Sequence, residues 1–432
     1  MKSSADYFER EDCRMCLSKD LSLAVTLTAS PPGNNFIKND EAEIEEQEFP
    51  LQLKFCNQCF HVQLAHIVDP KFLFQNNYSY VSSTSAVFVK HLADYSNHVT
   101  DFLGLSNDSF VVDIGSNDGA CLKGFKKKGM RVLGVDPARE VADIAIKNGI
   151  ETIADFFSLD IAKIITKNYG KADLVTSHNA CAHIDDLDQI IDGVRELMRH
   201  DGVFIMEVGY FLDVFKNKWF DTIYHEHLDF HTVAPLKRLF ERFGMEIFRV
   251  ERISPQGGSI RVFSQNKKGK YEIESSVDNL IKLEEEEGLQ DISSLENFDK
   301  EINIIGQKFK KLLSEQKSQG ASIAAYGAPT KATTLCYHFG IGTEFIDFIV
   351  DDNPLKQGML SPGKHIPVLS SEQIYEQKPD FVVILAWNFA SEIMKKHLNL
   401  SLIQSNVFWK NVNKKPRKHC FGFFQRRGRC FG

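Results

Sequence analysis

The sequence predicts an α/β protein in which a small N-terminal metal-binding module precedes two α/β domains. Four cysteines stand in two C-x2-C pairs near the N-terminus, and short apolar runs alternate with helix-like stretches after Phe110 and again after Ser322. Strands that alternate with helices form βαβ units around a buried parallel sheet. The 432 residues are 43% hydrophobic and 25% charged, which suits several domains with a sizeable core and excludes a disordered or collagen-like chain.

The two cysteine pairs predict the first domain, over residues 1–70. In a chain without secretory features, paired knuckles indicate one tetrahedral zinc site rather than a disulfide framework. Four thiolates leave no open position on the metal, so we expect a structural zinc ion; four unrelated thiols are the alternative. Residues 49–55 alternate at period two, as a strand leading into the second knuckle should. The predicted zinc ligands are Cys13, Cys16, Cys56 and Cys59.

The second domain is expected over residues 71–270. Residues 86–105 carry apolar side chains at helical spacing, and four short apolar runs then predict the strands of a parallel sheet. Ligands of such sheets bind outside the carboxyl ends of the strands, so the residues that follow each run are candidate site residues. The four runs are residues 110–114, 131–136, 172–176 and 202–207.

A glycine-rich turn after the first of these runs is the first functional signal. Asp113 lies near the end of the run, and Gly115, Asn117 and Gly119 stand in the turn. The G-x3-G spacing differs from the G-x-G-x-x-G dinucleotide fingerprint. It resembles motif I of class I S-adenosylmethionine (SAM) methyltransferases, and a generic αβ turn with a surface aspartate is the alternative.

Further cofactor contacts are expected after the next runs. Asp136 ends the second run, where a carboxylate could accept both hydroxyl protons of a ribose, and Asp155 with Phe156 could flank an adenine ring by hydrogen bond and stacking. Asn179 and His183 follow the third run at the same carboxyl edge, and position makes His183 a candidate despite the frequency of buried structural histidines.

The densest cluster of chemically active side chains is at residues 220–227. Imidazole titrates near neutral pH, which suits His227 for abstracting a proton next to a carbonyl, with Glu226 as an orienting carboxylate and Tyr224 as a phenol donor. The H-E-x-x-H pattern of zinc proteases is absent. A mononuclear metal site through His225 and His227 and a His-rich core loop remain alternatives.

The third domain is expected over residues 271–410, followed by a basic tail at 411–432. Residues 277–320 are predicted to be mostly helical, and a second α/β alternation predicts a second doubly wound domain. We interpret the basic run in the tail as a solvated or flexible end. The predicted strands of this domain lie within 322–329, 345–351 and 380–386.

Taken in order, these motifs resemble the nucleotide-sugar C-methyltransferase family, which makes branched deoxysugars. The resemblance covers about residues 10–400 and includes Gly257 to Arg261, Val350 to Gly358 and Ala386 to Phe389. It implies a zinc-binding module, a Rossmann-like SAM-binding domain and a C-terminal α/β domain, with SAM and structural zinc as cofactors and a nucleotide sugar as the partner.

The same resemblance implies roles for the site residues. His227 would be the general base that removes the proton from C3 of a 4-keto-deoxysugar, with Tyr224 and Glu226 positioning or polarising the sugar and the imidazole and His183 nearby. Residues 78–85 are similar to the family's substrate loop, where Tyr80 or Tyr78 would act. The turn at Pro329 to Ala332 departs from the family pattern Y-G-A-x-A-K-G but keeps Lys331, a candidate phosphate contact.

Three other functions remain to be distinguished: an O- or N-methyltransferase, an NAD-dependent sugar oxidoreductase using the C-terminal domain, and a non-enzymatic binding module. The formal net charge of −7 argues against a nucleic-acid partner. No apolar run approaches the roughly 20 residues of a membrane helix, and residues 1–10 lack a signal-peptide core. We expect a cytoplasmic protein without a membrane span, as a monomer or dimer.

Overall fold

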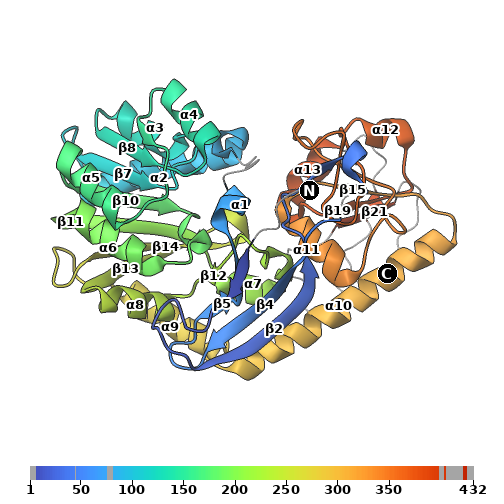
Figure 1. The fold of residues 1–432 in the computed structure, drawn as a ribbon, viewed down its shortest axis with the longest axis horizontal. Coiled ribbons are helices and arrows are strands. Elements are labelled where there is room, and N and C mark those ends of the chain that lie inside the picture. Colours follow the sequence, from blue (N-terminus) through green and yellow to red (C-terminus); the bar gives the residue numbers. More distant parts are fainter. Residues whose placement is uncertain (1–5, 44, 75–80, 398–402, 405–421, 426–432) are drawn as a thin grey trace.

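The computed structural model describes residues 6–43, 45–74, 81–397, 403–404 and 422–425. Figure 1 shows two α/β domains side by side, with the long N-terminal strands β2 and β4 running between them and the long helix α10 passing along β2. We refer to the N-terminal module (residues 6–74), the central domain (81–274) and the C-terminal domain (292–397). This arrangement is the predicted α/β architecture with a small N-terminal module.

The N-terminal module is built on an antiparallel four-stranded sheet in the order β12-β5-β4-β2. Alternate side chains of β4 are buried, beginning with Phe49, as the period-two pattern predicts. The edge strand β12 comes from the central domain and pairs with β5, so this sheet joins the two units. Its strands are β2 (Leu21–Ser30), β4 (Phe49–Cys56), β5 (Val62–Leu64) and β12 (Asp229–Phe230).

Smaller elements complete the N-terminal module. Strands β1 and β6 pair antiparallel with each other, and β3 pairs antiparallel with β17 of the C-terminal domain. The module therefore contacts the chain on both sides of it. The elements are β1 (Tyr7–Glu9), β3 (Ile37–Lys38), β6 (His66–Val68), α1 (Pro70–Phe74) and β17 (Met359–Leu360).

The central domain has a seven-stranded sheet in the order β13-β14-β11-β10-β7-β8-β9. Five strands, from β11 to β9, are parallel, and β13 and β14 form an antiparallel hairpin at one edge. The order reverses between β7 and β10, where such sheets open a ligand crevice at the carboxyl ends. The strands are β7 (Phe110–Ile114), β8 (Arg131–Val135), β9 (Thr152–Ile153), β10 (Ala172–His178), β11 (Met198–Gly209), β13 (Met245–Ile253) and β14 (Ser259–Asn266).

Helices alternate with the parallel strands of this sheet, as the sequence pattern predicts. The expected helix at 86–105 is α2 (Ala86–Leu103), which begins at the hydroxyl cap of Ser85 and ends at Gly104 in a left-handed conformation. The other helices are α3 (Ala120–Lys127), α4 (Arg139–Lys147), α5 (Leu159–Tyr169), α6 (Leu187–Leu197), α7 (Phe211–Asn217) and α8 (Val233–Arg242).

The C-terminal domain has a sheet in the order β18-β16-β15-β19-β21-β20, whose first four strands are parallel. The predicted helical region at 277–320 is two helices, α9 and α10, interrupted near Gly288, whose φ is 83°. Helix α9 (Ser275–Glu286) packs on β13 and α8 of the central domain. The elements of the C-terminal domain are α10 (Ile292–Ser318), β15 (Ile323–Tyr326), α11 (Thr330–Phe339), β16 (Phe348–Val350), β18 (Val368–Leu369), α12 (Gln373–Gln377), β19 (Phe381–Ile384) and α13 (Ala390–Lys396). Its sheet is completed by two strands from further along the chain, β20 (Ile403–Gln404) and β21 (Gly422–Gln425).

One segment of the predicted basic tail has a defined place. The backbone of β21 pairs antiparallel with β19 and also with β20. An open sheet edge offers unpaired backbone groups that such a strand can satisfy. The basic residues of the tail lie outside the described residues, so the expectation of a solvated or flexible end for them stays a prediction.

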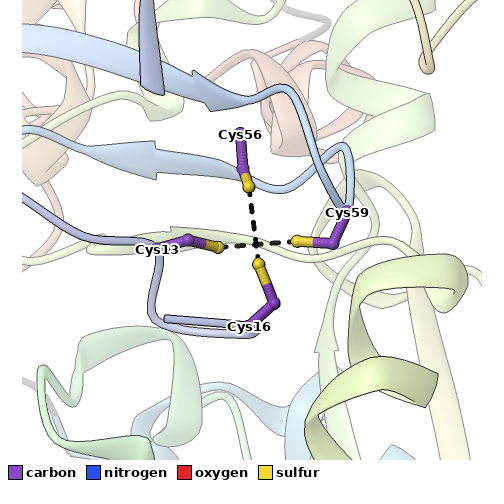
Figure 2. Close-up of side chains that lie close together, drawn as sticks. All are labelled: Cys13, Cys16, Cys56 and Cys59. Carbon is purple, nitrogen blue, oxygen red and sulfur yellow. Dashed lines mark hydrogen bonds between the residues drawn. The ribbon is translucent and has the colours of Figure 1, made fainter. Parts of the chain in front are cut away.

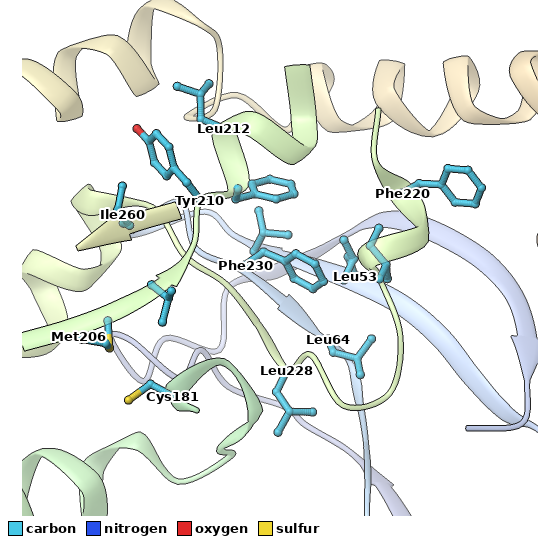
Figure 3. Packing of buried hydrophobic residues seen from close by; sticks show 14 of the residues in the cluster. Leu53, Leu64, Cys181, Met206, Tyr210, Leu212, Phe220, Leu228, Phe230 and Ile260 are labelled. Atoms are coloured by element: carbon cyan, nitrogen blue, oxygen red, sulfur yellow. The ribbon is translucent and has the colours of Figure 1, made fainter. Parts of the chain in front are cut away.

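A shared hydrophobic core joins the N-terminal module to the central domain. Figure 3 shows Leu53 and Leu64 of the N-terminal sheet close to Leu228 and Phe230. The last two follow residues 220–227, which we call the predicted catalytic segment. All four are buried. Burial of such apolar side chains fixes the position of the segment from which they project. Within the described ranges, no helix combines the length and apolarity needed to cross a bilayer.

Candidate active site and zinc centre

The four predicted zinc ligands form one cluster in the N-terminal module (Figure 2). The Sγ atoms of Cys13 and Cys59 are 3.5 Å apart, as are those of Cys16 and Cys56, and all four lie within 4.8 Å of one another. Zinc–sulfur bonds of about 2.3 Å in a tetrahedron place the sulfurs about 3.8 Å apart, whereas a disulfide needs about 2.05 Å. The donor set fits a structural zinc ion and excludes disulfides between these cysteines.

The two knuckles have the same local geometry. The amide of Leu17 donates to the carbonyl of Cys13, and the amide of Phe60 donates to the carbonyl of Cys56, each at 2.8 Å. Leu17 and Phe60 have positive φ angles of 63° and 67°. This matched pair of turns brings each C-x2-C pair of thiols to the same point.

The glycine turn after β7 packs closely against the segment that follows β10. Gly115 has a φ of 71°, and a Cβ built on it would lie 2.3 Å from the Cβ of Ala180. Only glycine suits this conformation and this close approach. Asn117, also at positive φ, accepts a hydrogen bond from the amide of Ser82 at 2.8 Å. The turn is thereby joined to the end of the predicted substrate loop.

Several buried polar atoms at this turn have no hydrogen-bond partner. They are Oδ1 of Asp113, both carboxylate oxygens of Asp118 and both ring nitrogens of His178. Burial raises the pKa of Asp113, and His178 Nδ1 lies 3.8 Å from its Oδ1, beyond hydrogen-bond distance. Buried polar groups are normally satisfied, so this set fits a site for a polar ligand such as the amino acid portion of SAM.

Asp118 is a candidate that the sequence analysis did not single out. It is fully buried in the same turn, between Asn117 and Gly119. A second acidic residue inside the glycine turn was the available signal, but sequence alone does not show that its carboxylate is buried and unpartnered.

The predicted ribose and adenine contacts follow the neighbouring strands. The carboxylate of Asp136 accepts from the amides of Asn117 at 2.8 Å and Ala138 at 2.9 Å, and burial raises its pKa. Asp155 is exposed and accepts from the amide of Phe156 at 2.8 Å. These residues follow β8 and β9 at the carboxyl edge, on the same side of the sheet as the glycine turn.

Asn179 occupies a strained position after β10. Its φ is 58°, and its amide donates to the carbonyl of Glu207 at 2.7 Å. Non-glycine residues in this region are uncommon, and asparagine tolerates it better than most. Residues 179–183 lie beside the glycine turn, where Ala180 packs against Gly115.

The predicted base, His227, forms a hydrogen-bonded pair with Tyr224. Its Nδ1 lies 2.8 Å from the backbone carbonyl of Thr222, which can only accept, so Nδ1 carries the proton and Nε2 has a free lone pair. The hydroxyl of Tyr224 lies 2.7 Å from Nε2 and donates to it. Burial is the main cause that lowers the pKa of His227 to about 4, so the imidazole is neutral near pH 7.

His183 and His227 lie next to each other. Their rings meet edge to face with centroids 5.0 Å apart, and the amide of Leu228 donates to the carbonyl of Ala182 at 2.7 Å. Because Ala180 lies against Gly115, the segment 179–183 connects the glycine turn to the histidine pair. The structure thus brings the predicted cofactor turn and the predicted base to the same end of the sheet.

Glu226 is placed differently from the expected orienting carboxylate. The hydrogen bond that orients His227 goes to the carbonyl of Thr222, whereas Oε1 of Glu226 accepts from Nδ2 of Asn34 at 2.9 Å. Burial raises the pKa of Glu226 to about 7, opposed by this hydrogen bond and by Lys356. The expectation that Glu226 orients the imidazole is therefore wrong for this contact, because a backbone carbonyl already occupies Nδ1.

His225 contributes to packing. Its Nε2 lies 3.2 Å from the carbonyl of Phe49, and the two rings meet edge to face at 5.7 Å. The alternative of a metal site through His225 and His227 is wrong, because their ring nitrogens are directed at different partners. Among the described residues, the sets of side chains that could hold a metal are the cysteine cluster and a group of Asp113, Cys121 and His178. Tyr78 and Tyr80 lie outside the described residues.

The C-terminal domain contacts the first half of the predicted catalytic segment (residues 220–227). The indole nitrogen of Trp387 donates to Oδ2 of Asp221 at 2.6 Å, and the hydroxyl of Thr334 donates to the carbonyl of Ile223 at 2.9 Å. The ammonium of Lys331 lies over the Trp387 ring, 3.4 Å from its centroid, and the lysine is almost fully buried. Burial lowers its pKa to about 8. Lys331 was a candidate from the sequence, and Asp221 stands in the predicted cluster at 220–227, but its contact to Trp387 could not be predicted because the two residues are 166 positions apart.

Models of known protein families match three successive parts of the chain. The model of a C-methyltransferase C-terminal domain matches residues 254–406, that of a methyltransferase domain matches 64–250, and that of a zinc binding domain matches 13–74. C-methyltransferase NovU from Streptomyces niveus is 34% identical over 384 residues, which cover 89% of this chain and 91% of NovU.

Solved structures similar to the chain include two proteins of low identity. Magnesium protoporphyrin IX methyltransferase (ChlM) from Synechocystis PCC 6803 with bound SAH has a TM-score of 0.33 and 15% identity, covering 41% of this chain and 83% of ChlM. The PH0226 protein from Pyrococcus horikoshii OT3 has a TM-score of 0.36 and 14% identity, covering 44% of this chain and 95% of that protein. By its match to NovU over nearly the whole length and by its domain models, the chain belongs to the family of SAM-dependent, zinc-binding C-methyltransferases.

Proposed function

We propose that this enzyme methylates C3, the carbon next to the ketone, of a nucleotide-linked 4-keto-deoxysugar, with His227 as the base that removes the C3 proton. The observation that carries the proposal is the 2.7 Å hydrogen bond between the Tyr224 hydroxyl and Nε2 of His227. A neutral acceptor and a hydroxyl donor stand side by side, which is the pair of groups that enolisation of a ketone requires.

Substrate binding would redistribute this hydrogen bond. The Tyr224 hydroxyl can donate to the ketone oxygen in place of Nε2, which frees the Nε2 lone pair for the C3 proton. As Nε2 takes the proton, the electron pair of the C–H bond forms the enolate double bond and negative charge moves to the ketone oxygen. The Tyr224 hydroxyl stabilises the charge on that oxygen. SAM, when bound, would supply an electrophilic sulfonium methyl group: the enolate carbon would form the new C–C bond as the methyl–sulfur bond breaks, and the S-adenosylhomocysteine thioether would leave with that electron pair. His227 keeps its orientation throughout through the 2.8 Å contact to Thr222.

The surrounding residues have roles in binding and positioning. His183 packs on His227 and limits its movement. Glu226, beside the base in sequence and partly protonated near neutral pH, is suited to hydrogen-bond a sugar hydroxyl. Tyr80 or Tyr78 would complete the substrate contacts. The residues proposed to bind SAM are Asp113, Gly115, Asn117, Asp118, Gly119, Asp136, Asp155, Phe156 and Asn179.

The nucleotide is proposed to lie at the C-terminal domain, which meets the catalytic segment through Asp221 and Ile223. Four thiols gathered in one cluster are stable in a reducing compartment, which supports a cytoplasmic location.

The decisive experiment incubates the protein with methyl-13C SAM and a panel of nucleotide-linked 4-keto-deoxysugars. Mass spectrometry and carbon NMR should locate the label on C3, and a methyl group on oxygen or nitrogen would contradict the proposal. The proton-abstraction step is tested separately in D2O. The wild type should exchange the C3 proton for deuterium, and His227→Asn should not.

A further inference from the structure

A loop of the N-terminal module, residues 33–36, lies between the catalytic segment and the C-terminal domain. A Cβ built on Gly33 would lie 2.3 Å from the backbone oxygen of Thr330, and the hydroxyl of Thr333 lies 3.4 Å from the oxygen of Gly33. The strand that follows the loop, β3, pairs with β17 of the C-terminal domain. The loop is therefore packed directly against the first turn of α11.

The side chain of Asn34 connects both neighbours of this loop. Its Nδ2 donates to Oε1 of Glu226 at 2.9 Å, and its Oδ1 accepts from the hydroxyl of Thr330 at 2.9 Å. An amide has a donor end and an acceptor end, and here each end has the partner that it requires. An aspartate of the same shape would keep the acceptor for Thr330 but would lose the donor to Glu226.

We propose that Asn34 is a positioning residue of the methyl-transfer site: its amide fixes the carboxyl group of Glu226 and ties it to the start of α11 in the C-terminal domain. This inference rests on the proposed function, because Glu226 is assigned to the sugar there. It gives the N-terminal module a role in positioning the active site, in addition to holding the structural zinc ion.

The burial of Glu226 makes this one contact important. Its side chain is almost fully buried, and its hydrogen bond to Asn34 opposes the rise in pKa that burial causes. The charged group that acts on it, among the described residues, is Lys356, whose ammonium donates to the carbonyl of Ala328 at 2.7 Å and lies 4.7 Å from the ring centroid of Phe36. A carboxyl group without its fixed donor can turn to other rotamers and holds its proton to higher pH.

The test compares Asn34→Asp and Asn34→Leu with a matched control one residue away. Asn35 also donates to a carboxylate, Oε2 of Glu46 at 2.9 Å, and Glu46 in turn accepts from the amide of Gly363 at 2.6 Å. Asn35→Asp therefore changes an amide–carboxylate contact of the same loop, one linked to the C-terminal domain through Glu46, without touching Glu226.

Both Asn34 variants should lower kcat by about 10- to 100-fold, the usual result of misplacing a group in an active site. The pH dependence of kcat/KM should contain a step from Glu226, identified because Glu226→Gln lacks it. The apparent pKa of that step should rise by about 1 pH unit in the Asn34 variants, more in Asn34→Asp than in Asn34→Leu. Zinc content and the Kd for SAM should match the wild type, and Asn35→Asp should keep the wild-type pH profile. An unshifted profile in well-folded Asn34 variants would overturn the inference.

Two further measurements keep the inference testable. The Asn34 variants could lose zinc or fail to fold. In that case Thr330→Val, which removes only the hydroxyl that donates to Oδ1 of Asn34, should still lower kcat and shift the pH profile. A Thr330→Val variant with unchanged kcat and pH profile would overturn the link to α11. If the wild type methylates no keto sugar, the proposed function fails, and the Glu226 carboxyl titration by carbon NMR decides the inference alone. That titration should move to higher pH in Asn34→Leu and stay in place in Asn35→Asp.

Discussion

The rings of His183 and His227 meet edge to face, with centroids 5.0 Å apart and an angle of 79° between their planes. Burial, followed by the neighbouring His227, lowers the pKa of His183 to about 3, and burial lowers that of His227 to about 4. Two imidazolium cations at this separation would repel each other in a poorly solvated site. The pair is therefore neutral above about pH 5, which leaves His227 able to accept a proton.

His227→Asn should abolish most of the turnover while leaving cofactor binding intact. Loss of a positioned base typically costs about 100- to 10,000-fold in rate. Steady-state kinetics and calorimetric titration with SAM measure the two effects. The control is His225→Gln, which can still donate to the carbonyl of Phe49 and should retain activity. Weakened SAM binding with normal chemistry in His227→Asn would contradict the assignment.

Acid sensitivity should be reduced by replacing His231. This residue is fully buried, both ring nitrogens lack a partner, and burial lowers its pKa to about 4. Its pKa in the unfolded chain is about 6.5. Between these values the unfolded state binds more protons, so stability falls as the pH is lowered, by up to about 1.4 kcal/mol per pH unit.

His231→Phe removes this proton uptake. The melting temperature should therefore fall less steeply from pH 7 to pH 5 in the variant than in the wild type. Thermal unfolding at each pH measures the difference, with zinc content determined in the same samples to separate metal loss from protonation. Parallel melting curves would show that His231 does not contribute to the acid sensitivity.

Four strands of the central domain, β7, β8, β10 and β11, could be predicted because local pattern and tertiary environment agree. Residues 110–114 are a short, mostly apolar run that includes Asp113, and they form β7, which is buried along its length. Strand β12 could not be predicted, because it has two residues and its partner β5 lies far away in the sequence. Pairings of this kind depend on tertiary packing and leave no periodic pattern.

The same distinction applies to the site. Tyr224 and His227 are close in sequence, so their cluster was visible, and the structure adds the contact between them. The carbonyl of Thr222 that orients His227 is a backbone atom with no signature in the sequence. Asn34 lies in a turn-rich segment, and its bond to Glu226 spans 192 residues. Only the fold could bring these two together.

Cys56→Ser should reduce zinc content and stability together. A hydroxyl is a poor replacement for a thiolate ligand of zinc, and a structural zinc site contributes directly to folding. Metal analysis of the purified protein and thermal unfolding check this prediction. Cys181→Ser provides the control, because Cys181 is buried but lies outside the cluster. A Cys56→Ser variant with full zinc content would contradict a four-thiolate site.

Asp118→Asn should weaken SAM binding by about 10- to 100-fold. Both oxygens of this buried carboxylate are unpartnered in the glycine turn, so a cationic group of the ligand has a strong preference for the charged side chain. Calorimetric titration with SAM measures the loss. Asp108→Asn, at an exposed position before β7, is the matched control and should bind SAM normally. Unchanged affinity in Asp118→Asn would assign the carboxylate a role in folding only.

Trp387→Phe should destabilise the contact between the C-terminal domain and the catalytic segment. The indole donates to Oδ2 of Asp221, which is fully buried and whose Oδ1 has no partner. Removing the donor leaves a buried carboxylate without its side-chain hydrogen bond, at a cost of about 1–3 kcal/mol. Thermal unfolding should show a lower melting temperature. Adding Asp221→Asn removes the buried charge and should recover part of the loss, because a neutral amide is less costly to bury. The single variant Asp221→Asn completes the comparison. If it lowers stability by the same amount in the wild type and in Trp387→Phe, the two residues act independently. The contact between Trp387 and Asp221 would then not stabilise the predicted catalytic segment.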